Sequence, residues 1–204
     1  MMKPLSLSKI FCLAAFAVLL LSPERSAANE TSENKGAFDT FSVGADAVGG
    51  GALGSYEDYW SPSAGARLEF GTPFYAGVLR AGGHLFDNEA SAADVPSFLG
   101  LWGYLEWSYE WLLPKRFAVS AGVETGVMYM VFDDDAIHEA RRNETELGFG
   151  VDSRLRYAFA ASWSVVVTGE YRVVLTEREI EYLFGGVGIV RTFASPKWLR
   201  EFLE

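Results

Sequence analysis

The chain has 204 residues and a formal net charge of −10 at pH 7, which argues against nucleic-acid binding because that depends on Lys and Arg neutralising phosphates. Beyond the N-terminal region no stretch approaches 18 consecutive apolar residues, so the sequence predicts no membrane-spanning helix. The single cysteine, Cys12, lies in the N-terminal apolar run, and disulfides and thiol chemistry are therefore excluded from the rest of the chain.

Residues 1–28 have the features of a secretory signal peptide. Residues 1–9 carry two lysines and no acid, residues 10–21 are apolar, and small residues lead up to Ala28. This apolar run is shorter than the roughly 20 residues of a permanent membrane helix, so a retained anchor is the weaker alternative. Cleavage after Ala28 removes three basic residues and one acid and changes the net charge from −10 to −12. Residues 29–37 are small and polar and predict a flexible lead-in.

The region 38–193 predicts one domain of eight short strands. Their expected ranges are 38–48, 63–71, 74–86, 98–112, 116–132, 145–160, 163–175 and 181–193. The expected connections alternate between long hydrophilic ones (49–62, 87–97, 133–144 and a shorter 176–180) and tight ones (72–73, 113–115 and 161–162). Such alternation is typical of a membrane barrel, in which one rim faces outward and the other faces the periplasm.

Side chains along the expected strands alternate between apolar and polar residues. In 116–132, for example, Val119 and Val123 share one face, whereas Ser120 and Glu124 share the other. A soluble barrel or sandwich would point the apolar face inward, and a membrane barrel would point it at lipid. Glycines beside the charges on the polar face favour the membrane barrel, because an eight-stranded lumen has little room for side chains.

Charges of both signs lie on the polar face, where they could pair inside a narrow lumen. The expected lumen charge network is Asp46, Arg67, Glu69, Arg80, Glu106, Glu110, Glu124, Glu146, Asp152, Arg154, Arg156, Glu170 and Arg172. A solvated strand face is the simpler alternative for each of these residues. The apolar face carries aromatic residues near strand ends, as an interfacial girdle requires: Trp107, Tyr109, Trp111, Trp163 and Phe193.

The final expected strand ends in Phe193 and places Leu183, Val187 and Ile189 at alternate positions before it, with Arg191 as a departure. In these features the chain resembles the small outer-membrane barrels typified by the OmpA transmembrane domain and OmpX. The resemblance implies a monomeric, closed, eight-stranded, antiparallel up-and-down β-barrel in contact with outer-membrane lipid and lipopolysaccharide. It also implies that the barrel-assembly machinery reads the final strand. Residues 194–204 continue past the aromatic and predict a short amphipathic helix, or else a frayed end.

Catalytic motifs are weak in this sequence. Only two histidines occur; we expect His84 to be a packed lumen residue and His138 to lie in a solvated charged loop, although its acidic neighbours could hold a divalent cation. No zinc spacing or phosphate-binding loop occurs after the signal peptide, so we expect no metal, no cofactor and no enzyme activity.

The leading functional hypothesis is a structural or surface-interaction role through the outward-facing loops 49–62, 87–97 and 133–144. The expected contact residues at the loop tips are Tyr56, Tyr59, Trp60, Asp133, Asp134 and Asp135. Two alternatives remain open: a narrow pore for small solutes, and an enzyme that modifies lipid A.

Overall fold

The computed structural model describes residues 38–92, 95–132, 143–176, 180–196 and 198. The expected signal peptide, lead-in and acidic run 133–135, as well as His138 and most of the tail 194–204, lie outside the described residues. Among the described residues, no helix has the length and apolar character needed to cross a membrane.

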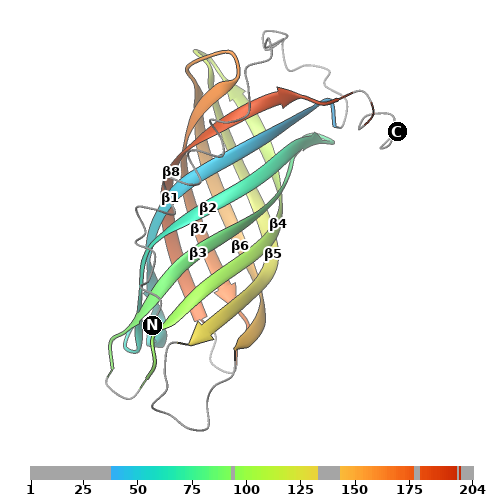
Figure 1. The fold of residues 1–204 in the computed structure, drawn as a ribbon. Coiled ribbons are helices and arrows are strands. Elements are labelled where there is room, and N and C mark those ends of the chain that lie inside the picture. Colours follow the sequence, from blue (N-terminus) through green and yellow to red (C-terminus); the bar gives the residue numbers. More distant parts are fainter. Residues whose placement is uncertain (1–37, 93–94, 133–142, 177–179, 197, 199–204) are drawn as a thin grey trace, which may run out of the picture.

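Eight antiparallel strands form one closed barrel in which each strand pairs with its neighbours in the sequence. The strands are β1 (Thr40–Leu53), β2 (Trp60–Phe74), β3 (Gly77–Ala90), β4 (Phe98–Leu113), β5 (Phe117–Phe132), β6 (Glu144–Ala158), β7 (Trp163–Val174) and β8 (Ile180–Ala194), with a short 3-10 turn, η2 (Gly54–Tyr56), after β1. β8 closes the barrel against the whole of β1, from Thr40↔Ala194 to Leu53↔Glu181. Figure 1 shows the resulting tilted, elongated barrel. The expected fold class is confirmed.

The connections fall into two sets at opposite ends of the barrel. We call the end with connections 54–59, 91–97, 133–143 and 175–179 the loop end, and the end with connections 75–76, 114–116 and 159–162 the turn end. Left-handed backbone at Tyr75, Lys115 and Arg116 allows two of the short connections to reverse the chain.

The expected turn at 72–73 is wrong, because β2 continues to Phe74 and turns at 75–76. Proline has no backbone N–H to donate to a neighbouring strand. Pro73 is tolerated because the pairing of β2 with β1 ends at Gly71, so β1 needs no hydrogen bond from position 73. The expected loop 49–62 is also too long: β1 extends to Leu53 and β2 begins at Trp60, leaving only 54–59 as a connection.

The outward face of the barrel is apolar. Val123 on β5 is 60% exposed and Phe149 on β6 is 54% exposed, whereas Glu124 and Asp152, their neighbours on the opposite face, are buried. A water-soluble barrel would show the reverse pattern. In hydrocarbon every backbone N–H and C=O group must find its hydrogen-bond partner within the protein, which a sheet achieves only when it closes into a barrel. A closed sheet with an apolar outer face is therefore the arrangement of a membrane-embedded barrel.

Aromatic residues gather on the outside near the turn end. Trp107, Tyr109 and Trp111 of β4 are between 39% and 48% exposed, and the rings of Tyr109 and Trp111 are 4.8 Å apart. Trp163 and Phe193 are half-buried at the same end, where the guanidinium of Arg191 lies 5.3 Å and 4.8 Å from their ring centres. The departure of Arg191 from the apolar pattern thus places a cation against interfacial aromatic rings.

Candidate functional site

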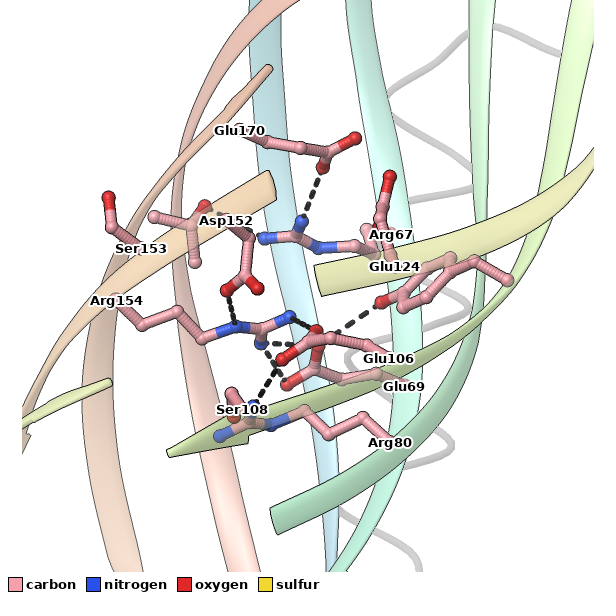
Figure 2. Close-up of polar contacts among 12 residues, drawn as sticks. Arg67, Glu69, Arg80, Glu106, Ser108, Glu124, Asp152, Ser153, Arg154 and Glu170 are labelled. Carbon is pink, nitrogen blue, oxygen red and sulfur yellow. Dashed lines mark hydrogen bonds and ion pairs between the residues drawn. The ribbon is translucent and has the colours of Figure 1, made fainter. Parts of the chain in front are cut away.

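Two layers of side chains fill the interior of the barrel between the open turn end and the loop end. The first is ionic and is centred on Arg154 of β6. Its guanidinium donates to Glu69 (2.6 Å), Glu106 (2.5 Å) and Asp152 (3.0 Å), so that three carboxylates from β2, β4 and β6 converge on one cation. Arg80 of β3 donates to Glu106 at 2.5 Å, and all five residues are buried. Figure 2 shows this convergence across the lumen.

Arg67 and Arg172 continue the ionic layer around the lumen. Arg67 donates to Asp46 at 2.5 Å and to Glu170 at 3.1 Å. Glu170 also accepts a hydrogen bond from Arg172, which in turn donates to Glu124 at 3.1 Å. Because these partners come from four strands, the layer ties together parts of the chain as far as 103 residues apart. Buried charges need such partners, because moving each ion from water into the protein interior costs on the order of several kcal/mol.

The second layer is aromatic and lies between the ionic layer and the loop end. It consists of Val48, Ala52, Tyr56, Phe86, Phe98, Trp102, Tyr104, Met128, Met130, Val174, Ile180, Tyr182 and Phe184. The guanidinium of Arg172 lies 4.4 Å from the Trp102 ring centre and 5.4 Å from that of Phe184, which joins the two layers by cation–π contacts. We call this layer the aromatic plug.

Glycines on the lumen face make room for the largest ring of the plug. A Cβ at Gly126 would lie 2.3 Å from the carbonyl oxygen of Gly103 and 2.6 Å from a ring carbon of Trp102. One at Gly148 would lie 2.6 Å from the carbonyl oxygen of Val173 and 3.0 Å from a ring carbon of Trp102. Both positions therefore accept only a residue without a side chain as long as the indole and the backbone of the neighbouring strand keep their places.

Substituting Gly126 by alanine is expected to lower the free energy of unfolding by about 1–3 kcal/mol, because the added methyl meets both the Gly103 carbonyl oxygen and the Trp102 ring. The matched control is Gly103→Ala, since a Cβ at Gly103 meets no atom within 4 Å. Urea unfolding of both variants in lipid vesicles measures the difference. Equal stabilities of the two variants would contradict the packing described for Trp102.

The turn end of the lumen is open. A cavity of about 700 Å³ reaches from the floor formed by Glu69, Arg80 and Arg154 to the rim, where Arg156 donates to Glu110 at 2.7 Å. This last pair is only half-buried. The cavity ends at the ionic layer, beyond which the aromatic plug fills the interior.

The loop end carries a small apolar pocket of about 190 Å³ above the plug. Tyr56, Trp60, Phe98 and Phe132 line it, with Glu144 among its few polar members. Tyr56 and Trp60 stack at 4.7 Å, and the Trp60 indole donates to the carbonyl of Pro96 at 2.8 Å. Burial, with contributions from the neighbouring Tyr182 and Glu144, raises the pKa of Tyr56 far above its ordinary value, so this phenol stays neutral.

The residues expected in the lumen network are placed as follows. Asp46, Arg67, Glu69, Arg80, Glu106, Glu124, Asp152, Arg154, Glu170 and Arg172 form the ionic layer, and Glu110 and Arg156 form the rim pair. Glu146 is half-buried near the loop end and makes no ion pair with a described residue. Sequence reasoning missed Ser108 and Thr168, whose hydroxyls accept from Arg80 and Arg67.

The expected loop contacts differ from the structure at two positions. Tyr56 is buried in the mouth of the barrel, and Trp60 is the first residue of β2 and not a loop tip. Tyr59 remains in the connection, half-buried beside the Trp60 ring at 5.8 Å. The reason is that the connection 54–59 folds over the lumen and buries its aromatic side chains instead of presenting them to solvent.

His84 lies in the plug and not at a polar centre. It is fully buried, with the rings of Phe86 and Phe184 at 4.6 Å and 4.8 Å. No group of three or more His, Cys, Asp and Glu residues in the described part of the chain is arranged to hold a metal ion.

No protein-family model matches the chain, and no curated protein sequence matches it. Solved structures do match. The chain superimposes on Neisserial surface protein A with a TM-score of 0.60 and 17% identity, covering 78% of this chain and 100% of that one. It also superimposes on the N-terminal β-barrel domain of Pseudomonas aeruginosa OprF with a TM-score of 0.53 and 11% identity, over 78% and 100% of the two chains. The chain therefore has the fold of the small eight-stranded outer-membrane β-barrels, as its sequence predicted.

Proposed function

We propose that this protein is a non-conducting barrel of a bacterial outer membrane that acts through the surface at its loop end. The filled lumen is the observation that carries this proposal. The ionic layer and the aromatic plug occupy consecutive levels of the interior, and Trp102, Arg67, Arg172 and Tyr182 are each at most 2% exposed. An eight-stranded barrel is narrow enough for side chains to close it completely.

The direction of the barrel in the membrane follows from its connections. Outer-membrane barrels place their longer connections outside the cell and their short turns in the periplasm, so the loop end faces outward in this proposal. The signal peptide ending at Ala28, insertion by the barrel-assembly machinery and contact with lipopolysaccharide all belong to the same proposal. The outer wall that would meet the lipid is the apolar face that carries Val123 and Phe149.

A pore and a lipid A-modifying enzyme are the competing functions. The pore is disfavoured because solutes would have to displace both the Arg154 ion pairs and the plug. A hydrolase would need a histidine within reach of a nucleophile and an acid. Among the described residues the one histidine is His84, which instead packs between Phe86 and Phe184, and this supports a non-enzymatic role.

Labelling of intact cells tests the proposal. With Cys12 replaced by alanine, a cysteine at Asp58 in the loop-end connection is expected to react with a membrane-impermeant maleimide on whole cells. A cysteine at Ala160 in a turn-end connection is expected to react only after lysis. The same protein in planar bilayers is expected to give no current steps, and lipid A from expressing cells is expected to keep its mass. The opposite labelling pattern would refute the orientation, steps would establish the pore, and a mass change would establish the enzyme.

A further inference from the structure

The pocket at the loop end has walls of aromatic rings from three parts of the chain. Tyr56 and Tyr59 come from the connection after β1, Trp60 begins β2, Phe98 begins β4 and Phe132 ends β5. Neighbouring rings contact one another in a continuous series: Tyr56–Trp60 at 4.7 Å, Trp60–Phe98 at 6.0 Å and Phe98–Phe132 at 5.2 Å. We call these five rings together with Glu144 the loop-end cage.

One carboxylate completes the cage. Glu144 is the first residue of β6, opposite Met130, and it lines the pocket while remaining exposed. Its position on the lumen-facing side of β6 directs the carboxylate toward the mouth of the barrel. The pocket therefore combines aromatic faces, which are negative at their centres, with a formal negative charge.

The whole loop end is acidic. Exposed or half-buried acids there are Glu57, Asp58, Asp87, Glu89, Glu144, Glu146 and Glu181. Among the described residues, the Lys and Arg side chains that reach solvent, Lys115, Arg116 and Arg156, all lie toward the turn end. Such a field concentrates cations at this mouth.

We propose that the loop-end cage binds an organic cation, namely an alkylammonium group such as a quaternary ammonium. Aromatic faces within about 6 Å of a cation attract it through their quadrupoles, and the effect grows when the group is shielded from water. The pocket volume of about 190 Å³ accepts one small head group and not a larger ligand. This inference relies on the proposed function only for the side of the membrane from which the ligand arrives.

Two other ligand classes fit the site less well. A metal ion would require several oxygen or nitrogen ligands, whereas Glu144 is the one carboxylate among the described residues that line this pocket. A neutral apolar group would use the rings but would gain nothing from the Glu144 carboxylate beside them. An alkylammonium group can contact the aromatic ring faces and at the same time pair its positive charge with the Glu144 carboxylate.

Choline and its uncharged isostere, 3,3-dimethylbutan-1-ol, have nearly the same shape, so a difference in their binding measures the contribution of the positive charge. The full-length protein, folded in detergent micelles, is titrated with each compound and binding is followed by saturation-transfer NMR. We expect choline to bind about tenfold more tightly than the isostere, a ratio that corresponds to the usual strength of a partly shielded cation–π contact. Equal binding of the two compounds, or no binding of choline, would overturn the proposal.

Two substitutions locate the binding to the cage. Glu144→Gln is expected to weaken choline binding about tenfold while leaving the isostere unchanged, because it removes only the charge. Glu89→Gln is the matched control, since Glu89 is an exposed acid at the same end outside the pocket, and it is expected to change choline binding less than twofold. If the two variants behave alike, binding is a general effect of the acidic surface and the cage is not the site. The mobility of unheated samples in semi-native gels confirms that each variant is folded, and the outcome is independent of the whole-cell labelling.

Discussion

Replacing Arg154 with methionine is expected to lower the free energy of unfolding by about 3–5 kcal/mol, the usual cost of removing one member of a buried ion-pair network. Methionine keeps most of the volume of arginine but removes the cation. Glu69, Glu106 and Asp152 would then lose their common partner while remaining buried. Urea unfolding in lipid vesicles, followed by tryptophan fluorescence, measures the change.

The control for this substitution is Arg156→Met. Arg156 is on the same strand and pairs with Glu110, but its side chain is 32% exposed at the rim of the turn-end cavity. Water screens such a pair, so we expect a loss of less than about 1 kcal/mol. If Arg154→Met costs no more than Arg156→Met, the buried ion pairs of Arg154 do not stabilise the barrel more than the exposed rim pair does.

The second large effect is expected from a charge on the outer wall. Val123 lies in the middle of β5, between Trp107 and Val151 on the neighbouring strands, and is 60% exposed. Val123→Arg would place a guanidinium in the hydrocarbon region and is expected to lower the free energy of unfolding by about 2–4 kcal/mol in lipid.

The control for Val123→Arg is the same substitution at a position nearer the end of the barrel, because the cost of arginine depends on its depth in the membrane. Tyr75 lies in a turn-end connection, beyond the end of β2, and is 86% exposed. Tyr75→Arg is expected to cost no more than about 1 kcal/mol, because the penalty for arginine falls toward the interface. Similar effects of the two substitutions would show that Val123 does not face lipid.

The sequence was sufficient to predict the strands and their faces because successive side chains in a strand point to opposite sides of the sheet. The alternation of apolar and polar residues therefore shows which side each residue occupies. Val123 was expected on the apolar outer face, and Glu124, Asp152 and Glu170 in the lumen, and the structure places them so. The alternation does not show how far along the barrel axis each residue lies. Which arginine meets which carboxylate depends on the stagger of strands far apart in the chain, as for Arg154 and Glu69, which are 85 residues apart.

The aromatic plug was missed although its residues carry a readable signal. Along β4 the lumen-facing positions change from Phe98, Trp102 and Tyr104 near the loop end to Glu106 and Ser108 further along. Treating each strand face as uniformly polar hid this change. The burial of Tyr56 could not be predicted at all, since a connection has no period that shows whether it folds inward or outward.

The orientation of the apolar face is tested most directly by spin labels in the folded barrel. With Cys12 replaced by alanine, a single labelled cysteine is placed in turn at Val123, Phe149 and Val167, and the barrel is inserted into lipid vesicles. We expect each label to collide more often with dissolved oxygen, which partitions into hydrocarbon, than with a water-soluble nickel chelate. Labels that favour the nickel chelate, or that are shielded from both reagents as in a packed core, would contradict the membrane-embedded barrel.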